Sequence, residues 1–142
     1  MQDRFDFMFG SRMASGNALK GGMPRLKFVI NKIVCFLENV LLGVHFTEHF
    51  SGFRAYSSQL LKTVPFEKFS DDFVFDQQME IAAISYGFRI GEIAIPTRYH
   101  EKASSIQFLK GSKFLLDTFF YLILFKLHQT KLIRSNLFLQ TT

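Results

Sequence analysis

Polar side chains that could do chemistry gather in three short stretches of the sequence, residues 10–12, 47–54 and 70–76. Each stretch lies where an apolar run gives way to a loop. In open α/β sheets, ligands bind in the crevice beyond the ends of the strands. The three stretches therefore predict a shared site at one rim of a sheet.

The charged residues of these stretches suggest specific roles. A guanidinium offers paired donors and keeps its charge, so Arg12 and Arg54 are predicted to hold phosphate oxygens. Glu48 is predicted to act as a general base, and Asp76 to orient a nucleophile or a sugar hydroxyl. A simpler interpretation stays open for each, since such arginines often pair with surface acids and Asp76 also suits a helix cap.

No metal site is predicted from these residues. His45 and His49 have the four-residue spacing of zinc ligands on a helix, but Gly43 ends the predicted helix before them. Cys35 is the only cysteine and lies among apolar residues, so we expect a buried, inert thiol and no internal disulfide. A reducing, cytoplasmic setting fits this composition.

The chain has 142 residues, of which 48% are hydrophobic, enough for one domain with a core and too many for a disordered chain. Residues 1–101 carry 11 basic and 11 acidic side chains, whereas residues 102–142 carry six basic side chains and only Asp117. The net charge of +5 therefore belongs to the tail. Such a tail suits anionic lipid or phosphate, and no nucleic-acid partner is expected without a broad basic face.

Hydrophobic periodicity predicts the elements that must position these residues. Residues 5–9 suggest a buried strand that ends at Gly10-Ser11-Arg12, and residues 13–23 a mobile loop. Residues 25–42 predict a largely buried helix ended by Gly43. Further along the chain we expect an extended segment over residues 50–56, a short helix from Ser57 or Ser58 to Leu61, an amphipathic helix over residues 75–86, and a strand over residues 88–95 with a bulge at Gly91.

Residues 113–126 form an apolar segment between two lysines, with Asp117 inside it. The segment is too short and too interrupted to span a bilayer. Two interpretations stay open. One is an interfacial helix whose apolar side faces lipid, and the other is a core helix that covers the sheet.

The strings FGSR, ALKGGMP, TEHFSGFRAYS, SDDFVFDQQM, GFRIGEIAIPTRY and ASSI resemble, in content and order, the second half of a family 2 glycosyltransferase of the GT-A fold. The chain is similar to the polyprenyl-phosphate sugar transferases over about residues 5–110. The resemblance implies an α/β fold: a partial GT-A, Rossmann-like mixed sheet flanked by helices. Residues 1–110 would form the acceptor-side half of the domain, and residues 111–142 an apolar, basic C-terminal helical segment.

The resemblance also implies an activity. Family members transfer a sugar, usually with inversion, from a nucleotide-sugar donor to a lipid-phosphate or saccharide acceptor, with a divalent metal held by a D-x-D motif. These residues contain no D-x-D motif. The resemblance thus implies a fragment that is inactive alone and a Mg or Mn ion whose ligands lie mostly in the missing half. It also implies a cytoplasmic protein, peripheral at the inner face of the membrane.

Glu48 falls where relatives often carry an aspartate proposed as the catalytic base. The substrate-binding residues implied by the resemblance are Arg12, Arg25, His49, Arg54, Asp76, Ser104 and Ser105. Gln78 stands where many relatives have Glu, so it can support only binding or packing. A second function stays open: a non-catalytic module that binds anionic membrane surfaces through the basic segment of residues 102–134.

Overall fold

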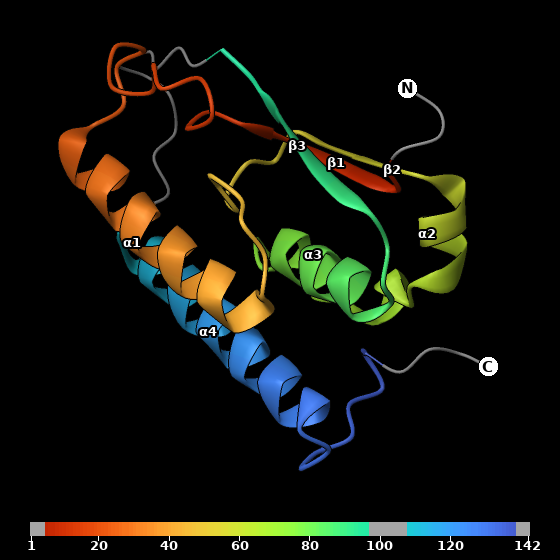
Figure 1. The fold of residues 1–142 in the computed structure, drawn as a ribbon. Helices are drawn as coiled ribbons and strands as arrows, with labels where there is room; N and C mark the ends of the chain where they lie inside the picture. Colours follow the sequence, from red (N-terminus) through yellow and green to blue (C-terminus); the bar gives the residue numbers. More distant parts are fainter. Residues whose placement is uncertain (1–4, 97–107, 139–142) are drawn as a thin grey trace.

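A three-stranded mixed sheet forms one side of the protein (Figure 1). In the computed structural model, which describes residues 5–96 and 108–138, β1 (Phe7–Ser11) is the central strand. It pairs antiparallel with β2 (Arg54–Tyr56) and parallel with β3 (Ile90–Ala94). The predicted α/β class, a mixed sheet flanked by helices, is confirmed.

Among the residues that the structure describes, four helices and one short 3₁₀ turn accompany this sheet. They are α1 (Arg25–Leu42), α2 (Ser58–Thr63), α3 (Phe75–Ser85) and α4 (Phe108–Gln129), and the turn is Phe66–Lys68. Figure 1 shows α3 beneath the sheet, α2 beyond the end of β2, and α1 and α4 side by side along the opposite flank. No helix within the described ranges has the length and apolar character needed to cross a bilayer.

The core lies on both sides of α3. Met79 and Ala82 of α3 pack against Phe7 and Phe9. These two phenylalanines lie on the same face of β1, because every second residue of a strand points to the same side. On its other side, Ile81 belongs to a second cluster, formed with Leu42, Leu122, Phe125 and Phe138. The predicted helix is therefore present, but the expectation of an amphipathic helix is wrong, because α3 is covered on both sides.

Helix α1 has the predicted bounds and ends at Gly43, whose φ of 73° is left-handed. The expectation that α1 is largely buried is wrong, since most of its large apolar side chains are exposed, Leu26 and Phe36 among them. The residues that α1 buries include Asn31 and Glu38. The reason is that the side of the helix that carries Asn31 and Glu38 faces inward.

Helix α4 covers other helices and not the sheet. Its buried Leu122 and Phe125 pack with residues of α1 and α3. Leu116, Phe120 and Ile123 lie on its exposed side, at 54% exposure or more. The segment thus has one packed face and one open apolar face. The interpretation as a core helix that covers the sheet is wrong, since α4 packs on α1 and α3, and the interfacial helix stays a prediction.

The strand pairing corrects one expectation. Strand β1 ends at Ser11, within the predicted stop at residues 10–12, and its register with β3 runs without interruption from Phe7 opposite Ile90 to Ser11 opposite Ala94, so the bulge predicted at Gly91 is absent. Gly91 instead leaves room for a neighbouring side chain. A Cβ placed there would lie 2.6 Å from Met8 Sδ.

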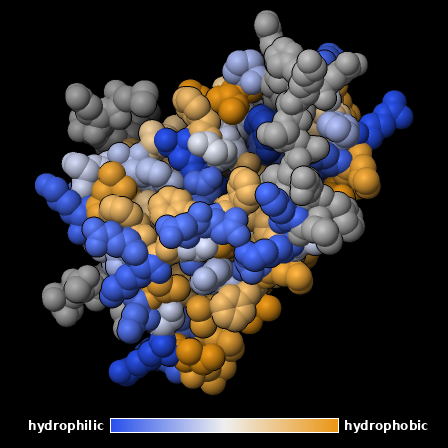
Figure 2. Space-filling model, turned by 180° about the vertical axis from the view of Figure 1, so that it is seen from behind, coloured by the Kyte–Doolittle hydropathy of each residue, from blue (hydrophilic) through white to orange (hydrophobic). Residues whose placement is uncertain are grey.

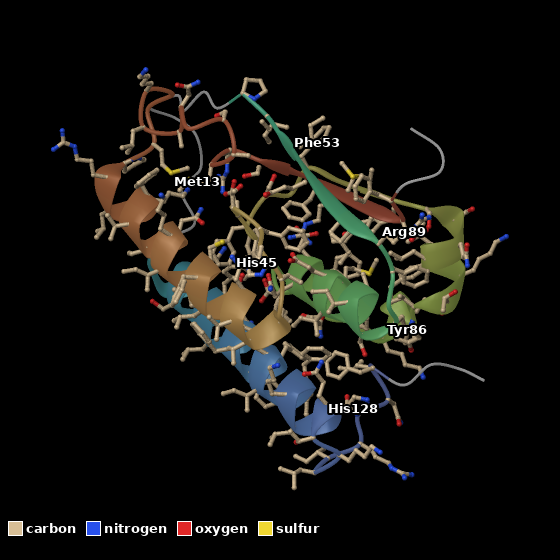
Figure 3. The ribbon with its side chains drawn as sticks, viewed as in Figure 1. Met13, His45, Phe53, Tyr86, Arg89 and His128 are labelled. Atoms are coloured by element: carbon tan, nitrogen blue, oxygen red, sulfur yellow. The ribbon has the colours of Figure 1, made fainter. Side chains whose placement is uncertain are left out.

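Gly10 provides a test of this packing. A Cβ at Gly10 would lie 2.7 Å from Ile95 Cγ2 and 3.1 Å from the ring of Phe53, which is labelled beside the sheet in Figure 3. Because the β-branched Ile95 moves little, Gly10→Ala should lower the free energy of unfolding by roughly 1–3 kcal/mol. Urea unfolding monitored by circular dichroism measures this change.

Gly52→Ala is the matched control, because the nearest atom to its Cβ is Asp76 Oδ2 at 3.9 Å. This change should stay within about 0.5 kcal/mol of the wild type. Equal effects at the two positions would contradict the close packing around Gly10.

Candidate functional site

The segment between α1 and β2 crosses the carboxyl end of β1. In Figure 1 this yellow-orange segment runs from the end of α1, past α3, to the sheet. It carries Glu48 and His49, whose side chains are both fully buried. Buried ionisable groups need charged or hydrogen-bonding partners, so the contacts of these two residues define the site.

Glu48 is held by the chain just after β1. The backbone N–H of Arg12 donates to Glu48 Oε2 at 2.7 Å, and Arg12 Nε donates to Oε1 at 2.8 Å. Arg12 Nη2 forms an ion pair with the same Oε1. Asn31 of α1 adds a hydrogen bond from Nδ2 at 3.1 Å. Arg12 and Glu48, predicted from separate stretches, are therefore direct partners.

At the same end of the sheet, two hydroxyl groups and one carboxylate are linked by hydrogen bonds. Ser11 Oγ lies 2.6 Å from Thr47 Oγ1, and it also accepts the backbone N–H of Ala14 at 3.0 Å. Thr47 Oγ1 donates to Glu92 Oε2 at 2.8 Å. Glu92 thereby joins β3 to the residue that precedes Glu48.

His49 lies between two helices and contacts carboxylates on both. Its Nδ1 is 2.5 Å from Glu80 Oε1 of α3 and 3.5 Å from Glu38 Oε2 of α1. Its Nε2 lies 3.2 Å from Asn39 Oδ1, and Asn39 also accepts the backbone N–H of Phe46 at 3.0 Å. His49 thus links α1, α3 and the connecting segment.

The protonation states follow from this burial. Burial alone lowers the pKa of His49, but the adjacent Glu80 carboxylate and further partners, Glu38 among them, raise its pKa to about 11. Burial raises the pKa of Glu38 to about 8, against the lowering effect of His49. At neutral pH, His49 is therefore cationic and Glu38 carries its proton.

Arg54 has a structural role within the described part of the chain. Its side chain is only 3% exposed, and its Nε, Nη1 and Nη2 donate to the carbonyls of Ser51, Asp76 and His49 at 2.9, 2.7 and 2.6 Å. It also lies over the rings of Phe7 and Phe9. Arg54 thus fixes the segment that carries Glu48, and its contact with a substrate remains a prediction.

Asp76 is the most open of the predicted residues near this segment. Its side chain is 44% exposed and its Oδ1 lies 3.7 Å from Arg54 Nε. It lines an open pocket of about 440 Å³ together with residues of the preceding loop: Ser70, Asp71, Asp72, Phe73 and Phe75. The hydrogen bonds of Arg54 connect Asp76 with His49, next to Glu48, but neither Arg12 nor Glu48 lines this pocket.

The other predicted residues lie elsewhere. Arg25 is exposed at the first residue of α1, and it is not among the groups that converge on Glu48 or His49. Ser104 and Ser105 lie outside the described residues. Within the described ranges, no group of three or more His, Cys, Asp or Glu side chains could hold a metal ion, and Cys35 is free and buried as expected.

Several contributors escaped the sequence reasoning. Asn31, Glu38 and Asn39 are polar positions in an otherwise apolar helix, and none of them is among the predicted site residues. Glu80 stands within an apolar helix, and Glu92 within a strand. For Glu80, an acid flanked by apolar residues in a predicted helix was the available signal, because such a group needs a partner when it is buried.

Comparison with curated proteins finds a relative that matches most of this chain. The chain is 30% identical over 128 residues to an uncharacterized protein, MJ1222, of Methanocaldococcus jannaschii. The match covers 90% of this chain and 49% of the relative, so the chain spans about half the length of this curated relative. No family model matches the sequence, and no solved structure matches it.

The buried His49 predicts a specific dependence of stability on pH. Because its pKa is raised from 6.5 to about 11 on folding, its stabilising contribution is complete below pH 6.5 and is lost as the pH rises toward 11. His49→Gln should lower the free energy of unfolding by about 3–5 kcal/mol in mild acid. The difference from the wild type should shrink at alkaline pH, as urea unfolding across this range can measure.

Glu38→Gln is the matched control. Glu38 is protonated at neutral pH, so its amide analogue should change stability far less than His49→Gln does. A difference between the wild type and His49→Gln that stays constant with pH would contradict a cationic His49.

Proposed function

We propose that this chain forms the acceptor-facing wall of a sugar-transfer cleft in a family 2 glycosyltransferase of the GT-A fold. The observation that carries the proposal is the direct contact of Arg12 with Glu48 at the carboxyl end of β1. Strand ends of α/β sheets are where such enzymes place their ligands. The mixed sheet and the sequence strings quoted above support the same family.

In the proposed reaction, the nucleophile is a hydroxyl or phosphate oxygen of a saccharide or lipid-phosphate acceptor. This oxygen attacks the anomeric carbon of the donor sugar while the bond to the nucleotide diphosphate breaks on the opposite side, which inverts the configuration. Glu48 accepts the proton of a hydroxyl nucleophile. In an intact enzyme of this family, a divalent Mg or Mn ion would supply positive charge to the departing diphosphate. The described residues offer no cluster that fits such an ion.

Arg12 has a second role in this proposal. Its side chain is 21% exposed, so a substrate phosphate can reach its guanidinium from outside. A phosphate that takes over the guanidinium would release the Glu48 carboxylate from its strongest partner. Substrate binding and activation of the base would then be one event, with Asn31 retaining Glu48 in place.

The first test concerns the activity of the 142-residue chain. Incubated with nucleotide sugars, polyprenyl phosphate or saccharide acceptors and Mg or Mn, the chain alone should give no turnover, because no D-x-D motif is present. Fusion to a nucleotide-binding half of this family should restore transfer of radiolabelled sugar. Turnover by the chain alone, at the rate of an intact family member, would overturn the inactive-fragment proposal.

The second test concerns Glu48 within such an active fusion. Glu48→Gln should lower kcat by on the order of 10²–10⁴-fold, because the amide cannot take a proton. Glu48→Asp should recover part of the rate, and Glu92→Gln, which alters the neighbouring hydrogen bond to Thr47, serves as the control. If Glu48→Gln and Glu92→Gln reduce kcat equally, Glu48 has only a structural role.

The second candidate function is a membrane-surface module that uses the basic segment of residues 102–134. The open apolar face of α4 favours it, and so do the exposed Lys131 and Arg134 that follow the helix. Basic side chains beside apolar ones suit the headgroups of anionic lipids.

A further inference from the structure

Three polar side chains are enclosed where α1, α3 and α4 meet. Glu38 of α1, Gln77 of α3 and Thr118 of α4 are each at most 1% exposed, and we term them the polar layer. On the outer surface, hydrophilic side chains such as those seen from behind in Figure 2 are open to solvent. The polar layer is not, so each of its side chains needs a hydrogen-bond partner inside the protein.

The polar layer lies at one level of the helix packing. Each of its members stands four residues, about one helical turn, before a residue of the apolar cluster that contains Leu42, Ile81 and Leu122. Residues four apart share one face of a helix. In Figure 1 all three helices run from the upper left toward the lower right. The polar side chains therefore lie together on one side of the apolar cluster.

Contacts on the other side of the layer agree with this position. Phe114, one turn earlier on α4 than the layer, packs edge to face against Phe50, with ring centroids 5.5 Å apart. Phe50 follows His49, whose Nδ1 lies 3.5 Å from Glu38 Oε2. Burial raises the pKa of Glu38 to about 8, while His49 and, more weakly, the adjacent amide of Gln77 lower it. The layer is thus bounded by aromatic rings on one side and by the apolar cluster on the other.

The polar atoms of the layer form no hydrogen bond with any of the described residues. This holds for both carboxyl oxygens of Glu38, for Oε1 and Nε2 of Gln77, and for Oγ1 of Thr118. An unpaired polar group inside a protein is costly, and ordered water commonly pairs with such groups. The small Thr118 leaves space on α4 that Phe114 and Leu122 fill in the neighbouring turns.

The chemistry of the layer indicates which ligand it takes. The protonated carboxyl of Glu38, the amide of Gln77 and the hydroxyl of Thr118 each offer both a donor and an acceptor. A metal ion would use only the acceptors, and the cationic His49 beside Glu38 would repel it. An anion would use only the donors, and the Glu80 carboxylate on the same imidazole would repel it. Water donates, accepts and carries no charge, so it matches all three groups.

We propose that the polar layer is an internal hydration site, in which at least one ordered water molecule bridges Glu38, Gln77 and Thr118. The water joins the three helices by hydrogen bonds at the level where their apolar packing stops. It also gives the proton of Glu38 an acceptor beside the imidazole of His49. The site does not depend on the proposed sugar transfer.

The experiment is magnetic relaxation dispersion of the full chain in water enriched in oxygen-17, which detects water molecules that stay bound for longer than the protein takes to tumble. Thr118→Val keeps the shape of the side chain and removes its hydroxyl. Thr118→Val/Gln77→Leu should lose the dispersion amplitude of at least one water molecule relative to the wild type. In urea unfolding, Thr118→Val alone should raise the unfolding equilibrium constant about fivefold, because a water-mediated hydrogen bond is lost.

Ser85→Ala is the matched control, since it removes a hydroxyl near the other end of α3 that already donates to the carbonyl of Phe138 at 3.1 Å. It should keep the full dispersion amplitude, and circular dichroism should show all variants folded. If Thr118→Val instead lowers the unfolding constant, the hydroxyl is dry and unpaired, which would overturn the proposal. An equal amplitude in the wild type and Thr118→Val/Gln77→Leu would overturn it too, because the three side chains would then bond one another directly.

Discussion

The structure depends on the burial of two adjacent charged residues, Glu48 and His49, in a segment without regular secondary structure. Removing such groups from water is costly unless each is paired and hydrogen-bonded. Here the partners come from the end of β1 for Glu48, and from α1 and α3 for His49. The burial of one dipeptide therefore fixes the relative positions of the sheet and two helices.

This constraint determines which way the helices face. Helix α1 directs Asn31, Glu38 and Asn39 to the buried charges and so exposes most of its apolar residues. Helix α3 lies between the sheet and the pair α1 and α4, which is why it is buried on both sides and still carries Glu80. An apolar stripe ordinarily faces the core. At α1 this rule is reversed, because the polar side of the helix supplies the partners of the buried Glu48 and His49.

The same contacts give the candidate site its rigidity. Arg54 donates to three backbone carbonyls around the segment, and the hydroxyl chain from Ser11 through Thr47 to Glu92 holds its other end. A carboxylate positioned from several sides suits the proposed base, since proton transfer depends on placement within hydrogen-bond reach. Arg12 is the one partner of Glu48 whose side chain is partly open to solvent.

The sequence by itself determined the local elements and the α/β class. The bounds of α1, the Gly43 stop, the helical cap at Ser57 and the buried Cys35 follow from local rules of capping and periodicity. The three polar stretches also drew attention to Arg12 and Glu48 before any contact was known. Their site roles, like the family, remain proposals supported by resemblance and geometry.

Only the tertiary structure decided the orientation of α1, the continuous pairing at Gly91 and the partners of His49. A helical pattern shows two faces but does not say which one is covered, because that depends on residues distant in sequence. Glu38 and Glu80 are 42 positions apart, and each looks like an isolated acid until the fold brings both to one imidazole. The energy gained by pairing buried charges depends on residues that are far apart in the sequence. Periodicity alone contains no such information, and it therefore predicted, wrongly, that the apolar face of α1 lies in the core.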